Sequence, residues 1–98
     1  PGYIASSGFD TYPPELTDWL RSLPAAVPLR RVGTESEISA AITFLLSEGA
    51  AFINGETIQV DGGAPLVRAG PLMDLPETGN SKPFEGFHRG FKPKVLDG

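Results

Sequence analysis

The stretch INGETIQVDGG, residues 53–63, decides the fold that this sequence predicts. An Asn-Gly turn signal is followed by residues that alternate polar and apolar up to Val60, and Asp61 with two glycines then breaks the pattern. The stretch predicts a strand over residues 57–61, with Asp61 capping the glycine turn. Because the backbone groups of a lone strand need ladder partners, we expect this strand to belong to a larger sheet.

The residues before this stretch predict a helix over 35–48. Thr34 and Glu37 form a Thr-x-x-Glu capping box, which satisfies two backbone N–H groups at a helix start. Gly49 has the residue type of a C-cap. The apolar residues at helical spacing are Ile38, Ala41, Ile42, Leu45 and Leu46, with Ala40 and Phe44 beside them. This wide apolar arc implies a second partner surface.

A shorter amphipathic helix is predicted nearer the N-terminus. Leu16, Trp19, Leu20 and Leu23 fall at i, i+3, i+4 and i+7, which places them on one helical face. Pro14 suits the first helical position, and Pro24 ends the helix.

Residues 64–98 predict an extended irregular tail, because proline and glycine recur along them. Phe84, Phe87 and Phe91 make this tail too apolar for a solvated linker. We therefore expect it to lie against a surface, either its own or a neighbour's.

Composition narrows the class of protein. The 98 residues contain no cysteine, which excludes a disulfide framework and thiolate metal sites. A net charge of −4 without a basic stripe argues against nucleic acid as a partner. No run approaches the ~18 apolar residues of a membrane span, and His88 lacks a second ligand at metal-binding spacing. We expect a cytoplasmic protein with no metal and no membrane contact.

The ordered set of Pro-Gly loop, short helix, capped helix, Asn-Gly turn, strand and Val-Asp-Gly-Gly resembles the C-terminal portion of the short-chain dehydrogenase/reductase family. The resemblance covers residues 1–63. It implies an α/β fold: the last part of a Rossmann-type doubly wound parallel sheet, with lid helix, interface helix and last strand. The tail over 64–98 resembles the extended C-termini of trans-2-enoyl-CoA reductase-like and citronellol dehydrogenase-like members.

The resemblance also implies a cofactor loop. The family's Pro-Gly-x-Ile-x-Thr segment appears here as residues 1–6, PGYIAS. This match implies that Pro1, Gly2, Ile4 and Ser6 bind the nicotinamide of NAD or NADP. The backbone of Ile4 would bond the carboxamide, and the hydroxyl of Ser6 would reach the carboxamide or the diphosphate.

A substrate lid over residues 7–28 is implied in the same way. Its candidate wall residues are Phe9, Tyr12, Leu16 and Trp19. An apolar wall suits a small aliphatic or acyl substrate and excludes water from hydride transfer. The alternative is that this apolar stripe only packs the lid helix.

The family's catalytic Tyr-x-x-x-Lys pair has no match here, since Ser7 stands four residues after Tyr3 and Leu16 four after Tyr12. The Gly-rich phosphate turn is also missing, so no catalytic residue is assigned and we expect the 98 residues alone to be inactive.

The resemblance implies a homotetramer formed through helix 35–48 and strand 57–61. For the parent protein, the resemblance implies an NAD(P)-dependent oxidoreductase that transfers hydride between the nicotinamide and an aliphatic alcohol, a carbonyl or an enoyl-CoA substrate. The alternative function is a non-catalytic interaction module or tail-mediated assembly segment, whose apolar helices and Phe-bearing tail bind a partner.

Overall fold

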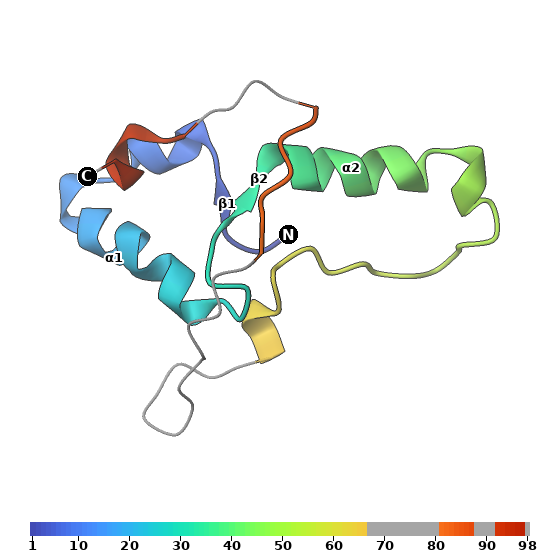
Figure 1. The fold of residues 1–98 in the computed structure, drawn as a ribbon, viewed down its shortest axis with the longest axis horizontal. Helices are drawn as coiled ribbons and strands as arrows, with labels where there is room; N and C mark the ends of the chain where they lie inside the picture. The colour runs from blue at the N-terminus through green and yellow to red at the C-terminus, as the bar shows by residue number, and fades with distance from the viewer. Residues whose placement is uncertain (67–80, 88–91, 98) are drawn as a thin grey trace.

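The computed structural model describes residues 1–66, 81–87 and 92–97. The order of its regular elements is β1 (Ile4–Ala5), α1 (Thr17–Ser22), β2 (Gly33–Thr34) and α2 (Glu35–Leu45) (Figure 1). Short 3-10 turns lie at Ser7–Thr11, Pro14–Leu16, Leu23–Ala26, Glu48–Ala50, Ala64–Leu66 and Lys94–Leu96. The described chain is thus a small α/β structure, consistent with part of a Rossmann-type fold.

The two strands form a parallel pair that links the N-terminal loop to the start of α2. Ile4 lies opposite Gly33, and Ala5 lies opposite Thr34. The backbone N–H of Gly33 donates to the carbonyl of Tyr3 at 2.8 Å. A Cβ at Gly33 would come within 2.8 Å of the Ile4 Cδ1 atom, so glycine allows the Ile4 side chain to lie across β2.

Helix α2 starts as predicted and ends earlier. The capping box is present: Glu37 N–H donates to Thr34 Oγ1 at 3.2 Å, and Thr34 N–H donates to Glu37 Oε1 at 2.9 Å. The helix predicted over 35–48 stops at Leu45, because the N–H and the hydroxyl of Ser47 both donate to the carbonyl of Phe44. Gly49 is therefore not the C-cap and lies in the following 3-10 turn.

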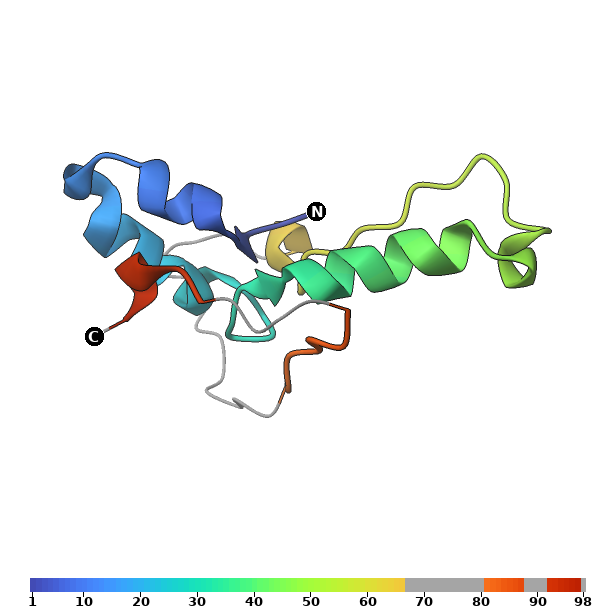
Figure 2. The same ribbon diagram turned by 90° about the horizontal axis from the view of Figure 1, so that it is seen from above.

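The strand predicted over 57–61 does not form in the described part of the chain, where the sheet consists of β1 and β2. Residues 53–59 run back from the turn after α2 as an exposed segment without helix or strand (Figures 1 and 2). Gly2 N–H donates to the carbonyl of Val60 at 2.9 Å, yet a gap of about 400 Å³ opens between Pro1–Tyr3 and residues 57–59. A strand without ladder partners is not stable, which explains the difference.

The buried core lies under the short helix rather than under α2. Phe9, Leu20 and Leu23 form a buried cluster, and Val32, Val95 and Leu96 pack against it. The predicted lid helix is divided, since α1 covers only Thr17–Ser22 between two 3-10 turns. By contrast, the side chains of Ile42, Phe44, Leu45 and Leu46 are between 41% and 83% exposed.

The described tail segments 81–87 and 92–97 lie on the chain's own surface, which is one of the two predicted alternatives. Residues 81–87 run beside the N-terminal end of α2, and residues 92–97 lie beside the turn Ser7–Thr11 and α1 (Figures 1 and 2). The rings of Phe84 and Phe87 meet edge to face with centroids 5.5 Å apart. Phe91 and His88 fall outside the described residues.

Within the described ranges, no helix combines the length and apolar character needed to cross a membrane. The same ranges hold no group of three or more His, Cys, Asp or Glu side chains placed to bind a metal ion.

Candidate functional site

The N-terminal loop, residues 1–6, is held against the turn that follows Val60. A Cβ at Gly2 would lie 2.7 Å from the Cβ of Asp61, so this approach requires glycine. Asp61 Oδ1 accepts the N–H of Gly63 at 2.8 Å, which is the predicted cap of the glycine turn. Gly62 and Gly63 have φ of +64° and +87°, a conformation that glycine adopts without strain. Pro1 is exposed at the end of this loop.

The register of β1 leaves the backbone of Ile4 facing away from β2. Gly33 bonds the carbonyl of Tyr3, the residue before Ile4, and Ile4 is the direct partner of Gly33. In a parallel ladder the partner residue then directs its own N–H and C=O to the opposite side. One donor and one acceptor of Ile4 therefore point out of the two-stranded sheet.

Ser6 follows β1 directly and is half-buried. It takes the N-cap position of the turn Ser7–Thr11 with extended backbone angles, φ −135° and ψ 170°. Its hydroxyl makes no capping hydrogen bond there, while its carbonyl accepts the N–H of Phe9 at 3.0 Å. The hydroxyl of Ser6 is thus not committed to holding the turn.

The four candidate wall residues of the lid differ in exposure. Phe9 is buried, and its ring stacks on that of Tyr12 with centroids 6.4 Å apart. Tyr12, Leu16 and Trp19 are 47%, 39% and 48% exposed. Trp19 also meets Tyr3 edge to face at 6.4 Å. The structure therefore brings α1 and the N-terminal loop together through the rings of Trp19 and Tyr3.

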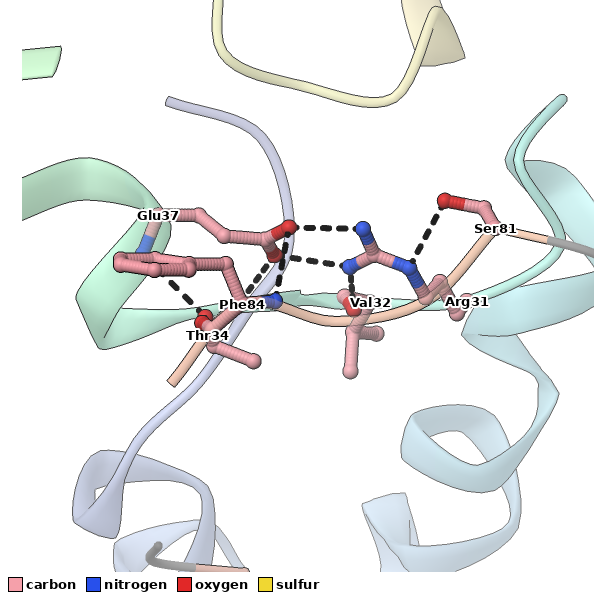
Figure 3. Close-up of polar contacts among 6 residues, drawn as sticks. All are labelled: Arg31, Val32, Thr34, Glu37, Ser81 and Phe84. Atoms are coloured by element: carbon pink, nitrogen blue, oxygen red, sulfur yellow. Dashed lines mark hydrogen bonds and ion pairs between the residues drawn. The ribbon is translucent and has the colours of Figure 1, made fainter. Parts of the chain in front are cut away.

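A polar cluster fixes the start of α2 and was not predicted beyond the capping box. Arg31 donates to both carboxylate oxygens of Glu37 at 2.7 Å and to the hydroxyl of Ser81 at 3.1 Å (Figure 3). Phe84 N–H donates to Glu37 at 3.4 Å, and the Thr34 hydroxyl donates to the carbonyl of Phe84. The capping motif was the one local signal for this cluster, because Ser81 and Phe84 come from the distant tail.

Glu37 is an anchoring anion rather than an acid or base. Hydrogen bonds from the Arg31 guanidinium lower the pKa of the Glu37 carboxyl from 4.5 to about 2, although partial burial acts in the opposite direction. The backbone N–H of Thr34, the charge of Arg31 and the N–H of Phe84 lower this pKa further. At neutral pH the carboxylate stays ionised and bound to its donors.

The sequence match now decides the family. A model of the family described as Enoyl-(Acyl carrier protein) reductase matches residues 1–65, which is more than half of the chain. The chain belongs to the short-chain dehydrogenase/reductase family. The matched residues contain the N-terminal loop, the predicted lid segment 7–28, α2 and the Val-Asp-Gly-Gly turn.

Curated relatives agree with this assignment. Nodulation protein G of Rhizobium sp. (strain N33) is 38% identical over 68 residues, 68% of this chain and 26% of the relative. Acetoacetyl-CoA reductase of Acinetobacter sp. (strain RA3849) is 37% identical over 67 residues, 64% of this chain and 24% of the relative. 1-Cyclohexenylcarbonyl-CoA reductase of Streptomyces collinus is 43% identical over 56 residues, which is 51% of this chain and 20% of the relative. The chain spans about a quarter or less of the length of these relatives.

Proposed function

We propose that this chain acts as the C-terminal part of an NAD(P)-dependent short-chain reductase. Residues 1–6 bind the nicotinamide, and residues 7–28 form the lid over the substrate. The observation that carries this proposal is the register of β1, which directs the N–H and C=O of Ile4 away from β2.

The loop fits a nicotinamide carboxamide chemically. A primary carboxamide offers N–H donors and one carbonyl acceptor, and Ile4 presents one acceptor and one donor to match them. The Ser6 hydroxyl, which makes no capping hydrogen bond, supplies a further donor to the carboxamide or the diphosphate. No residue of this chain is proposed to choose between NAD and NADP, since the residue that reads the ribose 2′ position belongs to the first half of such folds.

When bound, the nicotinamide would supply the hydride. The residues of this chain would orient its ring and exclude water from the site. Ile4 and Ser6 fix the plane of the ring, because two directional hydrogen bonds define an orientation. The aromatic contact between Trp19 and Tyr3 keeps the lid beside the loop. The lid excludes water from the site during hydride transfer.

We propose an acyl thioester as the substrate class, with the hydride moving to a carbonyl or an enoyl carbon. Two of the relatives reported above are named as reductases of CoA thioesters. The exposed apolar side chains of the lid, Tyr12, Leu16 and Trp19, suit an acyl chain. An aliphatic alcohol or its carbonyl is the second candidate, because the same apolar wall accepts it.

The proposed assembly is a homotetramer that uses α2 and residues 57–61. The exposed apolar side chains of α2 include Ile42, Phe44 and Leu46, and Ile58 on the following segment is 47% exposed. An exposed apolar surface of this kind marks an interface. The alternative of a non-catalytic interaction module uses the same surface without cofactor binding.

The test uses the protein produced from its full-length gene. NADH and NADPH oxidation is followed with acetoacetyl-CoA and with a trans-2-enoyl-CoA, and NAD(P)⁺ reduction is followed with a medium-chain alcohol. We expect oxidation that depends on a thioester. Calorimetry with each nicotinamide alone separates the alternatives, since a protein that binds neither NADH nor NADPH would be an interaction module.

A further inference from the structure

The end of the chain is bound by two oppositely charged lid residues. Arg21 in α1 donates from Nε to the carbonyl of Val95 at 2.6 Å and from Nη2 to the carbonyl of Asp97 at 2.8 Å. Asp10, in the turn Ser7–Thr11, accepts the backbone N–H of Lys94 at 3.1 Å and of Val95 at 3.0 Å. Two charged groups from different lid elements thus hold one backbone stretch, residues 92–97.

The same stretch completes the core of the lid. Pro93 is fully buried, and Val95 and Leu96 pack against the cluster of Phe9, Leu20 and Leu23. The turn Lys94–Leu96 contacts both α1 and the turn Ser7–Thr11, and Figure 1 shows it beside them. The lid therefore buries its apolar side against the last residues of the chain.

The lid depends on packing against residues 92–97 to keep α1 folded. Helix α1 has six residues, and an isolated helix shorter than about 12 residues is marginal in water. Its order must come from packing of Leu20 and Leu23, and residues 92–97 supply part of that packing. Hydrogen bonds to charged groups are among the stronger ones in proteins, so the four bonds to Arg21 and Asp10 fix the register of this cover.

The position of α1 determines where the lid wall lies, because the exposed side of this helix faces the N-terminal loop. Trp19 meets Tyr3 edge to face, two residues before Arg21 in the same helix. The N-terminal loop has its own anchor in the pairing of Ile4 with Gly33. A shift of α1 would therefore move the lid wall while leaving the cofactor loop in place.

We propose that residues 92–97 are a clamp on the substrate lid, and that Arg21 and Asp10 are positioning residues for the acyl substrate. The positioning role rests on the proposed reductase function, whereas the clamp itself does not. Loss of the clamp loosens the lid, which raises KM for the thioester and leaves KM for the nicotinamide unchanged.

The first measurement does not depend on activity. Amide hydrogen exchange is measured by mass spectrometry in the full-length protein, on peptides that cover residues 7–23 and 92–97. Arg21→Ala removes two hydrogen bonds, and we expect exchange in both peptides to become about tenfold faster. Asp10→Asn keeps one acceptor oxygen and should give a smaller increase. Asp18→Asn, an exposed acid on the same helix, is the matched control and should change neither peptide.

The second measurement is steady-state kinetics with the better thioester. We expect Arg21→Ala to raise KM for the thioester about five- to tenfold, with KM for the nicotinamide within twofold of wild type. Arg21→Lys, which keeps the charge but not the fork of donors, should recover part of this loss. If Arg21→Ala does not fold, Arg21→Lys and Asp10→Asn carry both measurements.

The outcomes separate the two proposals. Unchanged exchange in both peptides in Arg21→Ala and Asp10→Asn would overturn the clamp. Faster exchange with an unchanged thioester KM, or with both KM values raised equally, would overturn the positioning role. A wild-type protein with no reductase activity would contradict the proposed function, and the exchange data would still decide whether the clamp exists.

Discussion

Arg31 and Glu37 bind each other through a forked pair of hydrogen bonds, both 2.7 Å long, with side chains only 19% and 20% exposed. The pair joins the residues before β2 to the capping box of α2. Through Ser81 and Phe84 it also holds the tail segment 81–87 (Figure 3). One ion pair thus organises three parts of the chain that the sequence separates.

The Arg31–Glu37 pair predicts a specific pH dependence of stability. The pKa of Glu37 is about 2 in the folded chain against 4.5 ordinarily, so the unfolded state takes up a proton first as the pH falls. The contribution of Glu37 is complete above its ordinary pKa and is lost as the pH falls from there towards the folded value. The difference in unfolding free energy between wild type and Glu37→Gln should be about 1–3 kcal/mol at neutral pH and shrink in acid.

Urea unfolding of the full-length protein at several pH values measures this difference. Glu35→Gln is the matched control, because Glu35 begins the same helix but is exposed. A difference for Glu37→Gln that does not change between neutral pH and about pH 3 would contradict the assigned pairing.

Lysine at position 31 should not reproduce the hydrogen bonds of the Arg31 guanidinium. Its ammonium is a point charge and cannot occupy both carboxylate oxygens and the Ser81 hydroxyl with one planar fork. We expect Arg31→Lys to cost about 1–2 kcal/mol of unfolding free energy. Arg31→Lys made in the Glu37→Gln background should cost much less, since the partner charge is gone; equal costs in both backgrounds would argue against the pair.

Two glycines with positive φ give a matched steric test. A Cβ at Gly62, with φ +64°, would lie 2.6 Å from the Val27 Cγ1 atom, whereas Gly55, with φ +73°, has nothing within 4 Å. Gly55→Ala should cost about 1 kcal/mol from backbone strain alone. Gly62→Ala should cost about 1–3 kcal/mol more in urea unfolding, because the added methyl group also overpacks against Val27. Equal costs would mean that Val27 does not pack on the glycine turn.

The exposed face of α2 predicts assembly. Phe44 is 49% exposed on the helix proposed to form the tetramer interface. Phe44→Glu should break the full-length protein into smaller species on sizing chromatography, because a buried unpaired charge is costly. Thr43→Glu, exposed on the same helix, is the control. An unchanged size for Phe44→Glu would refute this contact.

Local features of this chain could be predicted from its sequence, and those that join distant segments could not. The capping box of Thr34 and Glu37 needs only four neighbouring residues, so it was found directly. The predicted end of α2 at residue 48 was wrong. The tendency of a helix to end at a glycine such as Gly49 was outweighed by the hydrogen bonds that Ser47 donates to the carbonyl of Phe44.

The strand over 57–61 shows the limit of periodicity. Alternation at residues 57–60 is typical of a strand within a sheet, but in the described chain these residues form no ladder, and the sheet consists of β1 and β2. The clamp was equally hidden, since Arg21 and Asp10 reach backbone groups 74 to 85 positions away. Backbone recognition leaves no pattern in the recognised residues, so sequence reasoning could place the tail only on an unspecified surface.

The central claim, that residues 1–6 bind the nicotinamide, is tested most directly by the neighbouring serines Ser6 and Ser7. The dissociation constants of NADH and NADPH are measured by calorimetry for wild type, Ser6→Ala and Ser7→Ala in the full-length protein. We predict that Ser6→Ala weakens binding of the preferred nicotinamide by about three- to tenfold, the loss of one hydrogen bond, while Ser7→Ala stays within about twofold of wild type. Equal affinities for all three proteins would contradict the claim.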